Sequence, residues 1–467
     1  MKKIIIIGSG GREHALAWKL YHDPKVEKIY CIPGNGGTKD FATNLDINFK
    51  DFNKILEVTE KYEIDMIIVG PENPLCNGIV DFFNNKKVKI FGPTKFASKL
   101  ESSKLFARKF MKDNNIPQPI FYESDSFEKS VRIRNEIGLP LVLKADGLAA
   151  GKGVIMCYKE SEFINGLKVL FEDKKFGAAS HKISIEECLI GDELSVFAVV
   201  DGKNYVVIGD AQDHKRVFDN DRGPNTGGMG SYSPTKICTP SLLKKVKKQI
   251  IEPTINGMNN LNEPFKGFLY VGLMIVNGNP YVIEFNVRMG DPETQVVIPR
   301  IDSSFYDLLE KAIDGDLADF NIQFKDSFYT TVVLASKGYP DKYEKGQKIK
   351  ISDDRRLLFH AGTKSVNDKI FVDGGRVMNV VGNGKTLEES IKDAYRQIEG
   401  IKFNNIFFRK DIGKKGIWKE IVMNIDKIKK SVGIVGNSEL IDEMLIKVAQ
   451  VATTDISVLV TGASGSG

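Results

Sequence analysis

The sequence has little cysteine and no long hydrophobic run. Its five cysteines are scattered and show no C-x-x-C spacing, at Cys31, Cys76, Cys157, Cys188 and Cys238. This pattern predicts neither a disulfide framework nor a zinc site, and it fits a reducing cytoplasm. No apolar run reaches the length of a membrane-spanning helix. The short run Ile4–Ile7 leads into glycines, so we expect a buried strand rather than a signal peptide, and no membrane partner.

The sequence also lacks a strong excess of one charge. Its 66 basic and 61 acidic residues are interleaved and leave a net charge of +5, which does not argue for a nucleic-acid partner. A hydrophobic content of 42% is typical of an ordinary soluble protein. A chain of 467 residues is long for a single core, so we expect two to four domains.

Residues 1–103 alternate between expected strands and helices, which predicts a parallel sheet covered on both faces. The strands are expected at Lys3–Ile7, Ile29–Ile32, Met66–Val69 and Lys89–Phe91. The loop Gly8–Gly11 then opens a helix near Arg12, but Glu13 replaces the last glycine of a dinucleotide fingerprint. We therefore expect the helix N-terminus to bind one phosphate, with a simple tight turn as the alternative. Glu72, in a second loop at the same edge, is a candidate for a ribose hydroxyl.

Two further stretches have the composition of nucleotide-contacting loops. Lys144 ends an expected strand, Lys152 lies in the glycine-rich loop that follows, and a strand restarts at Val154. Such a loop lets backbone N–H groups approach phosphates while the lysines supply charge; a hairpin with solvated lysines is the alternative. In Ile183–Glu193, edge backbone at Glu187–Leu189 is suited to adenine and Glu193 to ribose, although a plain hairpin would look similar.

The stretch 221–232 is so rich in glycine that we expect a loop without a packed core. Its interleaved Asp, Arg and Asn residues favour a loop that covers a substrate over a disordered segment.

A strand is expected at Pro280–Phe285. Glu284 and Asn286 are two positions apart, so both side chains point to one face of that strand. Carboxylate and amide oxygens are ligands that Mg²⁺ accepts while phosphate oxygens complete its shell. Arg288 falls on the same face if the strand continues, and its guanidinium suits a phosphate or a carboxylate. The alternative is a strand end with ordinary solvated charges.

Taken in order, these motifs resemble the ATP-grasp superfamily. Together with Gly8–Ala15, 223–230 and the E-F-N-x-R-x-G-D-P-E run at 284–293, they closely resemble the phosphoribosylamine–glycine ligase family over residues 1 to about 425. The resemblance implies an α/β and α+β multidomain fold with an ATP-grasp core. Its expected parts are a Rossmann-like domain at 1–103, an ATP-grasp domain at 104–327 with a lid at 118–192 and a central part at 193–327, and a small β-rich C-terminal domain at 328–425.

The resemblance also implies the chemistry. Glycine would be joined to 5-phosphoribosylamine through glycyl phosphate, with ATP and Mg²⁺ or Mn²⁺, in the second step of de novo purine synthesis by a monomeric enzyme. Metal binding falls to Glu284 and Asn286, and catalysis to Arg288, Asp213 and Lys152. The expected ATP contacts are Lys104, Lys144, Lys152, Glu186, Glu187, Leu189 and Glu193. The expected substrate contacts are Gly8, Gly10, Gly11, Arg12, Glu13, Glu72, Asp213, Asn225, Thr226, Gly227, Arg288 and Gly290.

The remainder of the chain carries fewer signals. Strands are expected at Tyr329–Ala335, Leu357–Gly362 and Phe371–Val381, and a helix at Thr386–Glu399, with His360 packed rather than reactive. Residues 426–467 depart from the family and resemble the truncated start of an AAA+ enhancer-binding activator domain, without its Walker lysine. We interpret this tail as a truncated fusion, an expression artefact or a gene-prediction join. Two alternatives stay open: another ATP-grasp carboxylate–amine ligase of purine synthesis, and a regulatory nucleotide-binding protein.

Overall fold

The computed structural model describes residues 1–147, 153–173, 181–352 and 357–417, together with 429, 441, 444 and 445. The chain separates into two units, Met1–Ile412 and Gly413–Gly467, and the architecture below is that of the first. The loop containing Lys152 and nearly all of the 426–467 tail lie outside the described residues. Among the described helices, none combines the length and apolarity needed to cross a bilayer.

The first 103 residues build a five-stranded parallel sheet in the order β3-β2-β1-β4-β5. The strands are β1 Lys2–Gly8, β2 Val26–Pro33, β3 Thr43–Asn44, β4 Met66–Val69 and β5 Lys89–Phe91. The helices are α1 Gly11–Tyr21, α2 Phe52–Lys61, α3 Glu72–Cys76 and α4 Ile79–Phe83. Alternate β1 residues are buried in two different clusters, Ile5 with Ile55 and Ile4 with Leu16. The four expected strands are confirmed, and the two-residue β3 was too short to predict.

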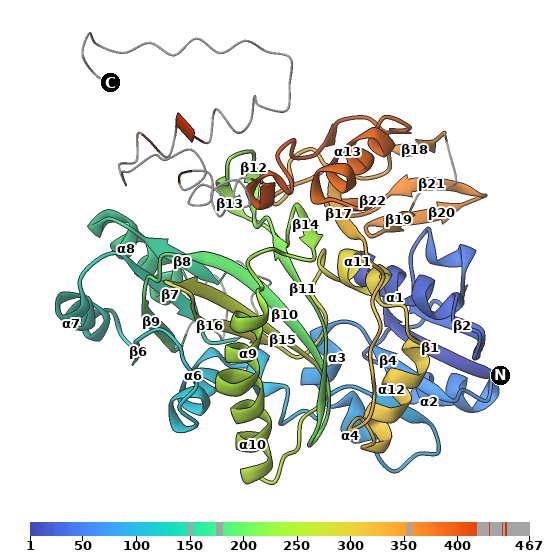
Figure 1. Ribbon diagram of the computed structural model, residues 1–467, viewed down its shortest axis with the longest axis horizontal. Helices are drawn as coiled ribbons and strands as arrows, with labels where there is room; N and C mark the ends of the chain where they lie inside the picture. Colours follow the sequence, from blue (N-terminus) through green and yellow to red (C-terminus); the bar gives the residue numbers. More distant parts are fainter. Residues whose placement is uncertain are drawn as a thin grey trace. The chain divides into compact units, whose positions relative to one another are not determined.

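A second, four-stranded sheet in the order β6-β9-β7-β8 forms the lid region. Helices α5 Lys99–Ser102 and α6 Lys104–Asp113 lead into it. Its elements are β6 Phe121–Ser124, α7 Phe127–Ile137, β7 Leu141–Ala145, β8 Val154–Cys157, α8 Glu160–Leu167 and β9 Ile183–Glu187. A separate small core, built around Leu143, Phe163 and Ile185, holds the lid together. Figure 1 shows the lid on the opposite side of the central strands from the β1–β5 sheet.

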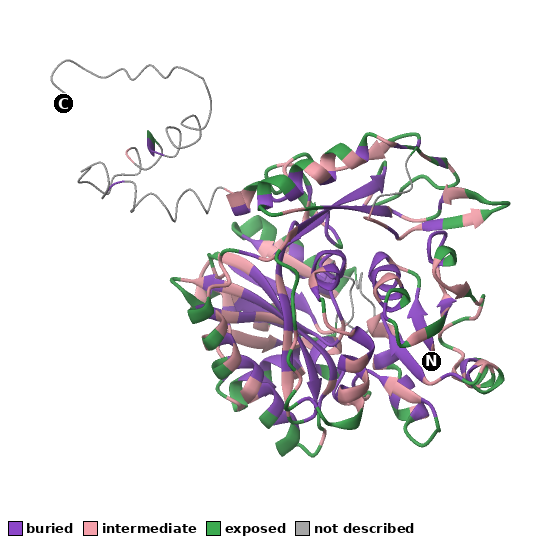
Figure 2. Ribbon diagram, turned by 45° about the vertical axis from the view of Figure 1, so that its right-hand side comes forward, coloured by how far each residue is buried: buried purple, intermediate pink, exposed green. Residues whose placement is uncertain are grey.

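The largest sheet has nine strands, in the order β16-β15-β10-β11-β14-β17-β22-β19, with β24 beside β17. Its strands are β10 Asp192–Asp201, β11 Tyr205–Asp213, β14 Gly230–Ser233, β15 Lys266–Val276, β16 Asn279–Asn286, β17 Phe328–Ser336, β19 Leu357–His360, β22 Arg376–Gly384 and β24 Ile406–Phe407. The associated helices are α9 Pro240–Val246, α10 Glu252–Asn260, α11 Thr294–Val297 and α12 Phe305–Asp314. Figure 2 shows buried residues along most of these strands and exposed residues on the outer helix faces. Position 327 is the expected boundary between the ATP-grasp and C-terminal domains. Because β14, before this boundary, pairs with β17, after it, the large sheet includes strands from both domains.

Residues 221–232 contradict the expectation of a loop without a core. The segment contains β13 Arg222–Asn225, paired with β12 Arg216–Phe218, and then β14 in the middle of the large sheet. Met229 and Tyr232 are almost completely buried. Glycine permits this packing because a Cβ at Gly230 would lie 2.6 Å from the Thr331 carbonyl oxygen. Local composition predicted a loop, whereas the glycines allow close strand approach.

The C-terminal part adds a four-stranded sheet in the order β20-β21-β18-β23. These strands are β18 Lys348–Ile351, β20 Thr363–Val366, β21 Lys369–Val372 and β23 Ile401–Lys402. The single strand expected at Phe371–Val381 is wrong, because a turn at 373–375 separates β21 from β22 and places them in different sheets. The expected helix is confirmed as α13 Leu387–Ile398, capped by Thr386 and Glu389 in a reciprocal capping box.

One buried ion pair ties the lid to the large sheet. Arg108 of α6 donates to both carboxylate oxygens of Glu186 on β9, at 2.8 and 2.6 Å. The same guanidinium donates to the carbonyl oxygens of Val282 and Ile283 on β16, at 2.9 and 2.8 Å. Burial alone would raise the pKa of Glu186, but the charges of Arg108 and Lys144 lower it to about 2. The Arg108 guanidinium therefore joins helix α6 to strands β9 and β16.

We predict that Glu186→Gln lowers the free energy of unfolding by about 3–5 kcal/mol at neutral pH, because it leaves buried cations without their carboxylate. The difference should shrink as the pH falls from about 4.5 towards 2, since the folded-state pKa lies below the unfolded value and wild type then loses this stabilisation. Thermal or denaturant unfolding across pH measures it. Glu123→Gln is the matched control in the same sheet: it breaks half-exposed pairs with Lys109 and Lys182 and should cost less than about 1 kcal/mol. Equal losses in both variants would contradict the prediction.

Candidate active site

The end of β16 presents the two predicted metal ligands. Glu284 and Asn286 flank the buried Phe285 on the last residues of the strand. A bulge in the pairing of β15 with β16 skips Ile283 and sets Glu284 opposite Gly272. A Cβ at Gly272 would lie 3.0 Å from the Glu284 Cγ, so the glycine leaves room for the carboxylate. The two oxygen donors therefore share one face, as the strand period requires.

Two lysines lie close to the Glu284 carboxylate. The Nζ atoms of Lys104 and Lys215 are 3.9 and 4.0 Å from its oxygens. Burial would raise the pKa of Glu284, but Lys215, then Lys104 and Lys144, lower it to about 2. Lys215 also lies 3.1 Å from Glu193, the residue predicted to hold a ribose. The sequence analysis missed Lys215, although its position two residues after Asp213 at a strand end was a usable signal.

Lys144 is held from two sides at the end of β7. Its Nζ lies 2.9 Å from the Glu186 carboxylate and donates at 2.9 Å to the carbonyl oxygen of Ile283. Burial lowers the pKa of Lys144 to about 8. The carboxylate of Glu186 also accepts from Arg108 and Ser184. Its oxygens are thus already occupied, and we interpret Glu186 as a residue that positions Lys144 rather than a side-chain contact to a nucleotide.

The segment predicted to contact adenine crosses between two sheets. β9 ends at Glu187 in the lid sheet, and β10 begins at Asp192 in the nine-stranded sheet. The plain-hairpin alternative is therefore wrong. Leu189 lies in the connection between the two strands. Glu187 is bonded twice to Ile120: its backbone N–H donates to the Ile120 carbonyl, and its carboxylate accepts from the Ile120 N–H at 2.8 Å.

Arg288 follows β16 and is held by two carboxylates. Its Nη2 donates to Glu101 at 2.7 Å and its Nε to Glu72 at 3.3 Å. Glu101 also accepts the backbone N–H of Val287 at 2.8 Å. Burial raises the pKa of Glu101, a residue that the sequence analysis missed. The carboxylate of Glu72, a predicted ribose contact, helps to orient Arg288 in this structure.

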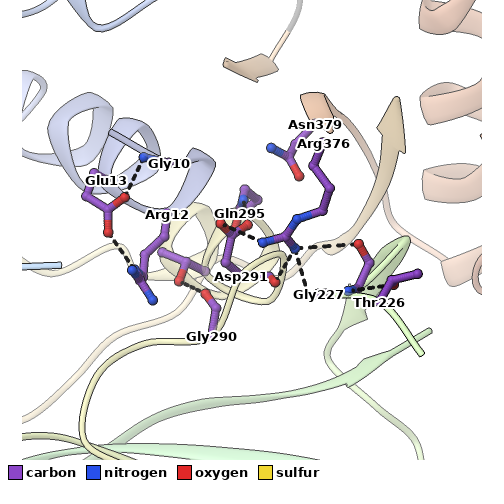
Figure 3. A network of polar contacts seen from close by, with 12 residues as sticks. Gly10, Arg12, Glu13, Thr226, Gly227, Gly290, Asp291, Gln295, Arg376 and Asn379 are labelled. Atoms are coloured by element: carbon purple, nitrogen blue, oxygen red, sulfur yellow. Dashed lines mark hydrogen bonds and ion pairs between the residues drawn. The ribbon is translucent and has the colours of Figure 1, made fainter. Parts of the chain in front are cut away.

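The glycine loop before α1 packs around a carboxylate of its own helix. The Gly10 N–H donates to Glu13 Oε2 and Arg12 Nε to Glu13 Oε1, both at 2.6 Å (Figure 3). A Cβ at Gly8 or Gly70 would lie 2.4 or 2.1 Å from atoms of the same Glu13 side chain. Gly8 of the predicted phosphate loop and Gly70 of the second loop therefore both leave room for the Glu13 side chain, and the Gly10 N–H is already bonded.

The turn after β16 meets the first and last domains. A Cβ at Gly11 would lie 2.3 Å from Asn379 Nδ2 and 2.5 Å from Gln295 Nε2. Gln295 in turn donates to Asp291 at 2.7 Å. The amide oxygens of Asn379 and Gln295 are buried and have no hydrogen-bond partner among the residues that the structure describes. Gly290, predicted to contact substrate, immediately precedes Asp291, and Figure 3 shows this group beside the glycine loop.

The predicted contacts of the 221–232 segment lie beside Lys215. The N–H and the hydroxyl of Thr226 both donate to the Lys215 carbonyl at 2.8 Å. Asn225 pairs with Arg216 at the base of the β12–β13 hairpin. Arg376 of β22 donates to the carbonyl of Gly227 at 2.7 Å. The sequence analysis assigned Arg376 no role and missed this contact.

Asp213 ends β11 and is buried near Glu293. Tyr270 donates to Glu293 Oε1 at 3.0 Å and itself accepts from Ser195 at 2.9 Å. Burial, reinforced by the charge of Asp213, raises the pKa of Glu293 to about 7. Lys215 supplies opposite charge nearby. The sequence analysis predicted a role for Asp213 but assigned none to Glu293.

Two histidines from distant parts of the chain are packed together. The His360 N–H donates to His14 Nδ1 at 2.9 Å, and burial lowers the pKa of both imidazoles. The expectation that His360 is packed is confirmed, and His14, at the start of α1, is buried as well.

The donor set fits a metal that is shared with phosphates. Within the described ranges, no group of three or more His, Cys, Asp or Glu side chains is arranged to hold a metal. Glu284 and Asn286 supply hard oxygens but too few to fill a Mg²⁺ shell. A nucleotide would supply the missing oxygens, and the lysines beside Glu284 would supply the countercharge for its phosphates.

Comparison with known proteins agrees with this arrangement. Three phosphoribosylglycinamide synthetase domain families match: the N domain at residues 2–101, the ATP-grasp (A) domain at 102–294 and the C domain at 329–415. The phosphoribosylamine–glycine ligase of Clostridium acetobutylicum is 44% identical over 415 residues, covering 88% of this chain and 99% of the relative. That of Halalkalibacterium halodurans is 42% identical over 423 residues, covering 90% of this chain and 98% of the relative.

Solved structures show the same similarity. The phosphoribosylamine–glycine ligase of Thermotoga maritima matches with a TM-score of 0.78 at 35% identity, covering 88% of this chain and 99% of that one. A biotin carboxylase domain from Hydrogenobacter thermophilus, solved with MgADP, matches with a TM-score of 0.66 at 14% identity, covering 87% of this chain and 91% of that one. The second match shows the fold alone. On the first match, the three domain families and the curated relatives, the chain belongs to the phosphoribosylglycinamide synthetase family of ATP-grasp ligases.

Proposed function

We propose that this ATP-dependent ligase joins glycine to 5-phosphoribosylamine and releases glycinamide ribonucleotide, ADP and phosphate, the second step of de novo purine biosynthesis. The observation that carries the proposal is the convergence of Lys104, Lys144 and Lys215 on the face of Glu284. A regulatory nucleotide sensor has no need of this set. The two relatives at 44% and 42% identity are both named phosphoribosylamine–glycine ligases. This favours phosphoribosylamine and glycine over the substrates of another carboxylate–amine ligase of purine synthesis.

The first half-reaction would activate glycine. A carboxylate is a poor electrophile, so a glycine oxygen attacks the γ-phosphorus of ATP, the bond to ADP breaks, and glycyl phosphate forms. This transfer depends on positioning and on neutralising charge. Mg²⁺ or Mn²⁺ at Glu284 and Asn286 would polarise the phosphates, while Lys104, Lys144 and Lys152 would offset their charge. Lys152 lies outside the described residues and enters on the composition of its glycine-rich loop and on the family resemblance.

The nucleotide base would lie against the connection between the lid and the large sheet. Edge backbone at Glu187 and Leu189 is suited to adenine, and Glu193 to the ribose hydroxyls. Lys215 fixes the carboxylate of Glu193 at 3.1 Å and thereby links the ribose site to Glu284.

The second half-reaction would join the amine. The phosphoribosylamine nitrogen attacks the glycyl carbon, phosphate leaves, and the nitrogen loses a proton. Asp213 would hold the glycine ammonium, and Arg288 the glycine carboxylate or the transferred phosphoryl group. Gly290, Asn225, Thr226 and Gly227 would line the same region.

Phosphoribosylamine would lie at the edge of the first sheet. Its 5′-phosphate would bind at Gly8, Gly11 and Arg12 beside the N-terminus of α1, where the helix dipole favours an anion. Gly10 and Glu13 would shape that loop, and Glu72 would approach the ribose. Residues 1–103, 104–327 and 328–425 remain our proposed functional divisions, and a cytoplasmic monomer remains our proposed state.

The decisive assay is ADP formation by the purified protein with glycine and freshly prepared phosphoribosylamine, each omitted in turn. We expect ADP release to require glycine and glycinamide ribonucleotide to form in equal amount. Stimulation by a different acid and amine would transfer the assignment to another ligase of this superfamily.

We predict that Glu284→Gln slows turnover by about a hundredfold or more, equivalent to roughly 3 kcal/mol, because it removes a preorganised charge at the phosphates. Melting temperature should fall less than in Glu186→Gln, since the Glu284 side chain is 28% exposed and its nearest cations lie 3.9 and 4.0 Å away. Glu63→Gln, at a side chain 84% exposed, is the control and should leave turnover unchanged. Near-native turnover of the Glu284 variant at saturating Mg²⁺ would refute the metal assignment.

We predict that Gly10→Val raises the KM for phosphoribosylamine far more than the KM for ATP. A Cβ at Gly10 would lie 2.9 Å from the Glu13 carboxylate and 3.3 Å from that of Asp291, so the valine displaces both from the loop. Steady-state kinetics with each substrate varied in turn measures the effect, and the KM for ATP is the internal control. Equal increases in both constants would mean that the loop has only a structural role.

A further inference from the structure

The hairpin of β12 and β13 begins directly after Lys215 and returns at Thr226. Its turn, 219–221, contains Asn220 and Asp221 at φ of 58° and 51°, values that Asn and Asp tolerate in tight hairpin turns. Both ends of the hairpin therefore start at the site, because Lys215 pairs with Glu193 and lies near Glu284. Most residues from 218 to 224 are exposed, so the hairpin has little core of its own.

The tip of this hairpin is bonded to residues 407–411 at the end of the C-terminal domain. The Lys410 N–H donates to the Asp219 carboxylate, and the Asn220 N–H donates to that of Asp411, both at 2.8 Å. Phe218 makes an edge contact with Phe407, their ring centroids 6.0 Å apart.

Arg409 is the charged centre of this contact. Its side chain is 1% exposed, and its Nη1 donates to Asp221 at 2.8 Å and to the Arg216 carbonyl at 2.9 Å. Its remaining nitrogens donate to Asp411 at 2.8 and 2.7 Å. The buried Arg409 guanidinium thus binds strand β12 through the Arg216 carbonyl and the hairpin turn through Asp221.

Arg376 makes the matching contact at the base of the hairpin. Its Nη1 donates to the carbonyl oxygens of Gly227 at 2.7 Å and of Asp291 at 2.5 Å, and its Nη2 lies 3.3 Å from the Asp291 carboxylate (Figure 3). A Cβ at Gly228 would lie 2.4 Å from Pro292 Cδ, so the two segments touch. Arg376 therefore joins the returning end of the hairpin to the turn that follows the metal strand.

We propose that Arg376 and Arg409 are positioning residues that hold segment 215–228 as a fixed wall of the site, and that this wall keeps water from glycyl phosphate. The inference rests on the proposed function, because that function supplies the acyl phosphate. If water reached it, a water oxygen would bond to the glycyl carbon, the carbon–oxygen bond to phosphate would break, and glycine and phosphate would be released. Such hydrolysis consumes ATP without forming product.

The test is the ratio of ADP released to glycinamide ribonucleotide formed, with both substrates present. Wild type is measured first and should give a ratio near one; a wild type without glycine-dependent ADP release would instead reject the proposed function. We expect Arg376→Ala, which removes the guanidinium at the base, and Asp221→Gly, which removes the carboxylate bound by Arg409 and suits the positive φ of the turn, to raise the ratio above about two, because water then reaches the intermediate.

Arg396→Gln is the matched control in the same domain, since that arginine has a side chain 77% exposed on α13 and pairs with Asp393 of the same helix. Its ratio should equal that of wild type. If Arg376→Ala does not fold by circular dichroism, Arg376→Lys keeps the charge but loses the forked geometry, and its ratio should also rise. A ratio that stays at the wild-type value in a folded variant, however slow its turnover, overturns the proposed role of that arginine.

Discussion

A requirement to pair buried charge organises this protein. Phosphoryl chemistry needs cations and oxygen donors in a space that excludes water, and each charge there loses hydration. The chain meets this cost with carboxylates from other elements: Glu186 for Lys144 and Arg108, Glu101 for Arg288, and Glu193 for Lys215. These pairs also connect the lid, the helices before it and the large sheet. The groups that stabilise the charges are thus the ones that position the domains.

Much of the site could be predicted where the signal is local. The period of a strand places Glu284 and Asn286 on one face, and the structure has both at the end of β16. The strands on either side of the glycine-rich loop at Lys144, and the alternation of the first domain, are also local patterns, and they are found where expected. In each case a few adjacent residues determine backbone conformation, and the conformation determines side-chain direction.

The remainder depends on partners that are far apart in sequence. Glu101 approaches Arg288 across 187 positions and Arg376 approaches Gly227 across 149, so no local pattern specifies either contact. The prediction of a loop at 221–232 was wrong for a related reason. Glycine alone does not favour a strand, and only the neighbouring Thr331 carbonyl and Pro292 ring show why a side chain is excluded at Gly230 and Gly228. The contacts that no local pattern predicts are therefore those made where domains meet.

The bulge at Ile283 has a consequence for how this position tolerates substitution. Because the residue is skipped in the strand ladder, its carbonyl oxygen is available to Lys144 and Arg108, at 2.9 and 2.8 Å. The cations are therefore bound by main chain, and the identity of the side chain at 283 is free to drift among residues that suit a strand. A position of this kind would look unimportant in a catalogue of variants, while an inserted or deleted residue beside it would move the carbonyl and disconnect both cations at once.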